Sequence, residues 1–167
     1  NICKFFRLAS QANPNQVDLL FARETQISHC SAVGRMIVDA RYLFLSQLCW
    51  KRYRGYAADQ MRGLIRMTRT GKRAELVEKH SYDTKFASHA FRLLLECDQI
   101  MFEGNLDLMR DNGEIKAIRN GEWSFERLEK EFEARKLAME QRLPQSKLPK
   151  QPDHEAIRNL LINCLEH

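Results

Sequence analysis

Four side chains carry charge or an imidazole into an otherwise apolar run between Ser81 and Cys97. They are Lys85, His89, Arg92 and Glu96, which follow one another at intervals of four, three and four residues. Because a helix turns by about 100° per residue, this spacing places the four side chains in one stripe on a helix whose other sides are apolar. Clustered cations that donate several hydrogen bonds are suited to binding phosphate. The stripe therefore predicts an open phosphate-binding groove.

An internal ion-pair network is the alternative explanation of the stripe. In that arrangement Glu96 neutralises Arg92, which lies one turn earlier, and other parts of the chain cover both. Three donors against one carboxylate leave excess positive charge, and buried charge without a partner is costly. The open groove is therefore favoured, with His89 accessible to solvent.

A band of positive charge runs from Arg41 to Arg73. It contains nine Lys and Arg residues and a single acid, Asp59. Clustered cations attract polyanions, and Tyr53 and Tyr56 among them are candidates to stack on a base. The alternative is a solvated helix face whose tyrosines belong to the core. Under the first interpretation the nucleic-acid surface comprises Arg52, Arg54, Arg62, Arg66 and Arg69.

No familiar catalytic motif is present in the sequence. It contains no nucleophile–base–acid set, HExxH motif, Gly-rich phosphate loop or paired-carboxylate motif. The nearest loop motif is IRNGEW, in which Arg119 precedes an Asn120-Gly121 turn. Its alternative interpretation is an ordinary turn followed by Trp123 as the anchor of the next helix. The residues alone thus predict a cationic groove for a nucleotide or nucleic acid.

Composition and charge indicate an ordinary soluble globular protein. Of the 167 residues, 44% are hydrophobic and 29% are charged, and the formal net charge is +5. No apolar run approaches the roughly 20 residues that cross a bilayer. The five cysteines are widely spaced, odd in number and form no CxxC pattern. They are predicted to be reduced core thiols of a cytoplasmic protein, with no metal site.

The elements that position these residues are predicted to be helices. Pro14 favours a first helical turn, and Ser124 and Asp153 are short oxygen-bearing caps. Asp111-Asn112-Gly113 is a hairpin-type turn signal. The predicted fold is mainly α, a bundle-like domain of about six helices with at most one small β-hairpin. Helical patterns span residues 1–11, 15–22, 31–46, 51–69, 74–80, 124–143 and 153–164, and the stripe lies on a further helix that begins at Asp83 or Thr84.

The chain is predicted to hold one main domain and a short tail. Residues 1–143 form the helical domain, 144–152 a polar linker, and 153–164 a C-terminal helix packed on the same domain. Residues 165–167 resemble the start of a vector-encoded histidine tag. The sequence begins without Met inside an amphipathic helix, so a further segment is expected upstream of Asn1.

Four stretches of the sequence together resemble one family. They are FxRLxxxANPNxxDLLF from Phe5, GYAxxQ from Gly55, YDTKxAxHxxRLL from Tyr82 and AIRNGEW from Ala117. In this order they are similar to the predicted nucleotidyltransferases of the DNA polymerase beta superfamily that are associated with RNA-repair ligases in phages and bacteria. The resemblance extends to about Leu161. Ser81 stands where Gly is usual in the family.

The resemblance implies a catalytic sheet that this sequence lacks. Family members begin with a small mixed sheet that carries a Gly-Ser turn and an Asp-x-Asp pair, and such carboxylates hold two metal ions. Neither feature occurs in this chain, so the catalytic residues are expected upstream of Asn1; the alternative is a remnant of the family that has lost them. Asp18 also departs from the family, in which Glu is usual. The resemblance thus implies Mg²⁺ as cofactor, with no metal ligand on this segment.

The resemblance also implies which residues face the substrate. Lys85, His89 and Arg92 are expected to contact a nucleoside triphosphate or the metal site. Expected nearby are Tyr56, Gln60 and Arg119, with Lys4 and Arg7 as further candidates.

The predicted function is metal-dependent transfer of a nucleotidyl group from a nucleoside triphosphate to an RNA end or another hydroxyl acceptor. This chain supplies the helical half that faces nucleotide and RNA, and alone it is predicted to be inactive. The alternative is a non-catalytic helical module that binds nucleic acid or a protein partner through the Arg41–Arg73 band. Steep salt dependence of binding would distinguish contact with phosphates from an apolar interface.

Overall fold

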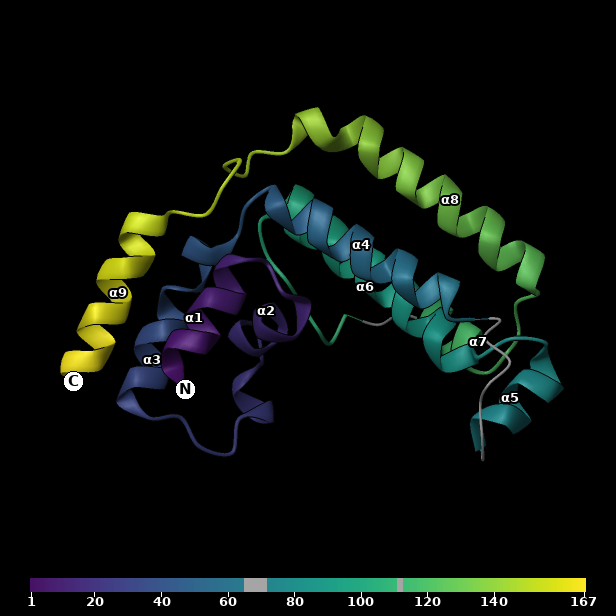
Figure 1. Cartoon of the computed structure of the whole chain (residues 1–167), viewed down its shortest axis with the longest axis horizontal. Coiled ribbons are helices and arrows are strands. Elements are labelled where there is room, and N and C mark those ends of the chain that lie inside the picture. Colours follow the sequence, from purple (N-terminus) through teal and green to yellow (C-terminus); the bar gives the residue numbers. More distant parts are fainter. Residues whose placement is uncertain (65–71, 111–112) are drawn as a thin grey trace. The chain divides into compact units, whose positions relative to one another are not determined.

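The computed structural model describes residues 1–64, 72–110 and 113–167 (Figure 1). These residues form nine α-helices and three 3-10 helices, with no strand among them. The mainly-α prediction is confirmed, with more helices than the expected six. The contacts divide the chain into two compact units, which we call unit 1 (residues 1–53, 96–109 and 145–167) and unit 2 (residues 54–95 and 110–144).

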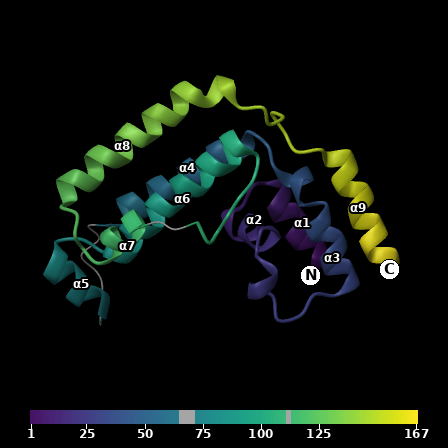
Figure 2. The ribbon, with the colours of Figure 1, turned by 180° about the vertical axis from the view of Figure 1, so that it is seen from behind.

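Unit 1 is built around the first helices of the chain and the last one. The α9 helix packs against α1, α3 and η2, and both views show it alongside α1 and α3 (Figure 1, Figure 2). The elements that lie wholly in unit 1 are α1 (Ile2–Ser10), α2 (Pro14–Leu20), η1 (Glu24–Gln26), α3 (Ala32–Asp39), η2 (Arg41–Phe44) and α9 (His154–Glu166).

Local capping chemistry explains where the unit 1 helices begin. The side chain of Asn1 accepts a hydrogen bond from the Lys4 amide, and that of Asn13 accepts one from the Asn15 amide just after Pro14. Asp153 likewise accepts from the Ala156 amide. These oxygens satisfy first-turn N–H groups that have no partner inside the helix. The helix predicted to start just after Pro14 begins one residue earlier, at Pro14, and the predicted Asp153 cap is confirmed.

The predicted linker is tied to unit 1 by hydrogen bonds. The Ser146 hydroxyl donates to the Met101 carbonyl at 2.7 Å. The Gln47 amide nitrogens donate to the carbonyls of Leu148 and Pro149, at 3.0 Å from the side chain and 2.8 Å from the backbone. The segment from Ser146 to Pro152 is therefore non-helical but held by hydrogen bonds.

Unit 2 contains α5 (Lys72–His80), α7 (Gly113–Arg119) and α8 (Phe125–Arg142), and it shares two longer helices with unit 1. These are α4 (Leu48–Arg62) and α6 (Thr84–Glu103), within which the unit boundaries fall. A short η3 (Leu143–Gln145) follows α8.

An aromatic cluster forms the centre of unit 2. Phe91 is completely buried and meets the rings of Trp123 and Phe132 edge-on, at centroid distances of 5.5 and 6.0 Å. The hydroxyl of Tyr82, which is also buried, donates a 2.7 Å hydrogen bond to the Trp123 carbonyl. Asp83 caps α6 by accepting from the amides of Lys85 and Phe86, as the sequence predicts. The start of α6 is thereby joined to the segment that follows α7.

Three predicted elements differ from the structure. The helix predicted over residues 31–46 ends at Asp39 as α3, and the 3-10 helix η2 follows it. The expected hairpin is not formed in the described residues, because Gly113 begins α7; Asp111 and Asn112 lie outside them. The helix predicted over residues 51–69 begins earlier, at Leu48, and α4 ends at Arg62. A Cβ placed on Gly63 would lie 2.8 Å from the Phe86 ring, so the glycine permits a close approach to α6 where the helix ends.

The five cysteines are free. Cys49, Cys97 and Cys164 are buried as predicted, whereas Cys30 is partly buried and Cys3 is exposed. Burial raises the pKa of the Cys49 thiol to about 11. The prediction of core thiols therefore holds for three of the five, because the amphipathic α1 turns Cys3 toward solvent.

Gly121 ends α7 in a turn that glycine alone fits well. Its φ is +76°, its amide donates to the Ile118 carbonyl, and the next amide, of Glu122, donates to the Ala117 carbonyl. These two bonds form a Schellman motif, in which a left-handed residue closes the helix end. A Cβ on Gly121 would also lie 2.1 Å from Nδ1 of His80. Backbone conformation and packing therefore both require glycine here.

Gly121→Ala should lower the free energy of unfolding by about 2 kcal/mol or more, through left-handed strain and the clash with His80. Gly55→Ala is the matched control: Gly55 lies inside α4 with nothing within 4 Å of its Cβ position. That change should raise stability by about 0.5–1 kcal/mol. Chemical denaturation of both variants measures the difference.

The double variant His80→Ala/Gly121→Ala separates the two causes. In the double variant the clash with His80 is absent and only the strain of the left-handed backbone remains. The effects of the two substitutions on the free energy of unfolding should therefore not be additive. Equal stability of wild type and Gly121→Ala would contradict this account of the turn.

Candidate functional site

Three of the four residues of the predicted stripe lie in one open pocket of unit 2, of about 420 Å³. Lys85 and Arg92 are exposed and His89 is half-buried. We call this site the α6–α7 pocket. Its lining comprises Lys85, Ser88, His89 and Arg92 from α6, and Ile115 and Arg119 from α7.

Arg119 reaches the pocket because α7 is held at both ends. The Schellman turn at Gly121 ends the helix directly after Arg119. At the other end, both nitrogens of the Arg135 fork donate to the Glu114 carboxylate, at 2.7 and 2.6 Å. Such bidentate pairs fix orientation as well as distance. The position of Arg119 beside α6 is thus set by a turn in its own motif and by an ion pair from α8.

His89 and Arg92 are paired within the pocket. Nη2 of Arg92 lies 3.2 Å from Nδ1 of His89. A guanidinium only donates hydrogen bonds, so Nδ1 is the acceptor and Nε2 of the neutral imidazole carries the hydrogen. Partial burial lowers the pKa of His89, and the charges of Arg92 and Lys85 lower it further. The pocket therefore favours neutral His89.

Glu96, the fourth stripe residue, is not part of this pocket. It is 4% exposed and belongs to unit 1. It lies near Tyr53, whose pKa is raised by burial first and then by negative charge, including that of Glu96. The four residues do lie on one side of α6, as their spacing predicts. At Glu96, however, α6 belongs to the core of unit 1, and this side of the helix is buried there. The predicted groove therefore ends before Glu96, and Tyr53 is a core residue.

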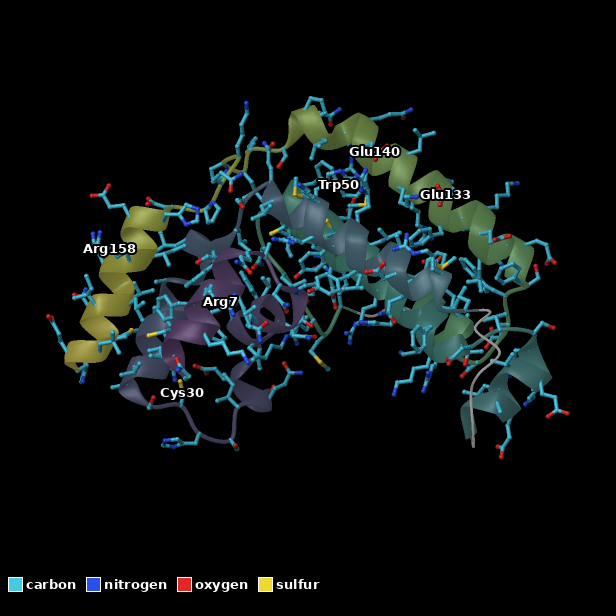
Figure 3. The ribbon with its side chains drawn as sticks, in the orientation of Figure 1. Arg7, Cys30, Trp50, Glu133, Glu140 and Arg158 are labelled. Atoms are coloured by element: carbon cyan, nitrogen blue, oxygen red, sulfur yellow. The ribbon has the colours of Figure 1, made fainter. Side chains whose placement is uncertain are left out.

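Tyr56 and Gln60 lie one turn apart on α4, outside the lining of the α6–α7 pocket. Tyr56 is 42% exposed and Gln60 is partly buried. Lys4 and Arg7 are exposed on α1 of unit 1, and Figure 3 labels Arg7. A role for these four residues in nucleotide binding remains a prediction.

The arginines of the expected nucleic-acid surface have different surroundings. Arg52 is exposed, whereas Arg54 pairs with Glu140 of α8 and Arg62 with Asp59. Arg66 and Arg69 lie outside the described residues.

Arg54 and Arg62 line a larger groove of about 790 Å³ with acids of α8. These acids are Glu133 and Glu140, which lie along that helix (Figure 3). The positive band is therefore partly neutralised within unit 2. Its contact with nucleic acid remains a prediction.

Ser88 and Ile115 are pocket residues that the sequence did not indicate. Ile115 lies four residues before Arg119, one turn away on the same face of α7. That relation was hidden because a hairpin was expected there. Ser88 lies beside His89 in an apolar run, so no sequence pattern marks it as a pocket residue. The Glu114–Arg135 pair joins residues far apart in the sequence, so no local pattern predicts it either.

The described residues contain no group of three or more His, Cys, Asp and Glu side chains placed to hold a metal ion. Within the same residues, no helix is both long and apolar enough to cross a membrane.

Comparison with known proteins places the chain in a family. The family model described as RlaP, RNA repair pathway DNA polymerase beta family, matches residues 1–163. No curated protein and no solved structure matches the chain.

The Arg92→Gln variant should raise the pKa of His89 toward its ordinary 6.5, because a neighbouring charge and a donor to Nδ1 are removed. Titration of the imidazole by NMR measures this change. Lys130→Gln, which removes an exposed charge of α8 outside the pocket, is the control and should leave the pKa in place.

The same shift has a consequence for stability. The folded state lowers the pKa of His89, so the unfolded chain binds this proton more readily. The stabilisation of the folded state by neutral His89 is complete above the pKa of about 6.5 that histidine has in the unfolded chain. It is lost as the pH falls through the lower pKa of the folded state. Unfolding free energies measured on either side of pH 6.5 should differ less in Arg92→Gln than in wild type. An unchanged difference would show that the pair does not control the titration.

Proposed function

Because the chain belongs to the RNA repair pathway DNA polymerase beta family, a family of nucleotidyltransferases, we propose that it serves nucleotidyl transfer from a nucleoside triphosphate to an RNA end or another hydroxyl acceptor. The observation that supports this role is the convergence of four predicted substrate residues in the α6–α7 pocket. They are Lys85, His89, Arg92 and Arg119. Two of the four family motifs thus supply side chains to one site.

In this proposal the pocket holds the phosphate chain. Its lining has three permanent positive charges and no carboxylate, so its field favours a polyanion. Arg92 and Arg119 each present a planar fork that can donate to two phosphate oxygens, and Lys85 adds a point charge. The α6–α7 pocket therefore suits a triphosphate better than a neutral ligand.

The same groups would lower the barrier to transfer. An acceptor hydroxyl loses its proton to solvent and its oxygen forms a bond to the α-phosphorus. The bond from that phosphorus to the oxygen that bridges the α- and β-phosphates breaks, and pyrophosphate leaves with the electron pair. Negative charge grows on the leaving phosphates, and fixed cations that contact them stabilise the transition state. The proposed role of Lys85, Arg92 and Arg119 is to bind and stabilise this leaving group.

Mg²⁺ for the reaction is proposed from the resemblance and does not fit the α6–α7 pocket. Magnesium takes oxygen ligands, usually with one or two carboxylates, and this lining contains none. We therefore assign no step of the reaction at this pocket to a metal ion.

The alternative of a non-catalytic module is less well supported. It depends on the cations between Arg41 and Arg73 facing a partner. Two of them, Arg54 and Arg62, are paired with acids of their own unit.

Transfer is tested by incubating the full-length protein with Mg²⁺, RNA and nucleoside triphosphates labelled on the α-phosphorus. Label should appear on the RNA, and Arg92→Ala should reduce the rate by about 10²–10³, the usual effect of removing one donor to developing charge. Arg158→Ala, at an exposed position on α9 (Figure 3), is the matched control and should retain the rate. An unchanged rate in folded Arg92→Ala would contradict the site. Absence of transfer with every acceptor would contradict the reaction.

A further inference from the structure

We infer that the α6–α7 pocket recognises the phosphate chain of its ligand and does not distinguish one base from another. This inference rests on the proposed function and narrows it to the part of the nucleotide that the site reads. It follows from the hydrogen-bonding character of the lining residues.

The four polar groups with the greatest reach all offer hydrogen-bond donors. The Lys85 ammonium and the guanidinium groups of Arg92 and Arg119 have no acceptor atom. His89 does have one, at Nδ1, but it already accepts from Arg92. Its remaining nitrogen, Nε2, is a donor in both the neutral and the protonated imidazole.

The two remaining residues add little that could read a base. The Ser88 hydroxyl donates to the Lys85 carbonyl at 3.1 Å, and its residue is 9% exposed. Ile115 contributes apolar surface and no polar side-chain atom. The lining therefore contains no carboxylate, no side-chain amide and no Phe, Tyr or Trp ring.

Adenine and cytosine display an amino group next to an acceptor atom, and proteins read these pairs with amide or carboxylate side chains, which this lining lacks. Guanine N7 and O6 are both acceptors, so an arginine fork can bind them. Those atoms are uncharged, however, whereas the charge on phosphate oxygens makes their hydrogen bonds with arginine and lysine stronger. When a phosphate chain is present, the donors of the lining should therefore bind phosphate in preference to a base.

A lining that binds the phosphate chain predicts how the affinities of different phosphate compounds should compare. Inorganic tripolyphosphate should bind about as tightly as a nucleoside triphosphate. Each phosphate removed should weaken binding about tenfold, since a hydrogen bond to a charged group contributes on that scale. The four common nucleoside triphosphates should bind within about threefold of one another, and adenosine should not bind.

Isothermal titration calorimetry of the chain in metal-free buffer measures this order. The titrants are tripolyphosphate, ATP, GTP, CTP, UTP, ADP, AMP and adenosine. Lys85→Gln and Arg119→Gln, both at exposed positions, should each weaken triphosphate binding about tenfold or more, and thermal melting checks that they are folded. Lys130→Gln is the matched control outside the pocket and should bind as wild type does.

A second measurement locates the binding independently of these variants. A phosphate chain beside His89 should raise the pKa of its imidazole, because nearby negative charge favours the protonated form. Tripolyphosphate and ATP should shift the His89 NMR titration equally, and adenosine should leave it unchanged.

The failures of the inference and of the proposed function can be told apart. One triphosphate that binds more than tenfold tighter than the other three, with binding lost in the pocket variants, would overturn the inference and keep the function. A different result is saturable binding that neither pocket variant weakens and that leaves the pKa of His89 unchanged. It would overturn both the inference and the proposed phosphate-binding role of this pocket. Absence of binding by every phosphate compound, tripolyphosphate included, would overturn the proposed role of the pocket.

Discussion

The hydroxyl of Tyr82 donates a 2.7 Å hydrogen bond to the backbone carbonyl of Trp123, and both side chains are buried in unit 2. Burial raises the pKa of Tyr82, so the group remains a donor. Removing the hydroxyl would leave a carbonyl without this partner, at a cost of about 1–3 kcal/mol. The bond joins the residue just before the Asp83 cap of α6 to the segment just after the Gly121 turn. The two helices that line the pocket are therefore held together where one begins and the other ends.

Several cations of unit 2 outside the pocket are paired with acids. Arg54 pairs with Glu140, Arg62 with Asp59, Arg135 with Glu114 and Lys136 with Glu133. These mostly exposed pairs contribute little to stability, since such pairs are worth about 0–1 kcal/mol. They do, however, reduce the positive field of α4 and α8. The lining of the α6–α7 pocket contains no acid, so positive charge persists there.

His89 responds to this local excess of positive charge. Its imidazole is held neutral by partial burial and by two cations, and it is bonded to one of them. An anion that entered the pocket would oppose both electrostatic effects. Phosphate binding would thereby be coupled to proton uptake by His89 at pH values between the pKa of the free pocket and that of the occupied one.

The sequence alone determined most of the local structure. Asn13, Ser124 and Asp153 cap helices as their side-chain chemistry requires, because capping depends only on atoms a few residues apart. The helical spacing of Lys85, His89 and Arg92 likewise placed three cationic or titratable groups on one face. The family motifs added Arg119, which no periodicity connects with α6.

Only the tertiary structure decided where that face is open. Glu96 follows the same spacing but is buried, because α6 passes from unit 2 into unit 1 and the boundary between the units falls inside a helix, where the sequence shows no change. The pairing of Arg54 with Glu140, the hold of Arg135 on Glu114 and the place of Ile115 in the pocket all depend on contacts between different helices. Helical period fixes direction around a single axis, whereas burial and charge pairing depend on what other helices bring to that side.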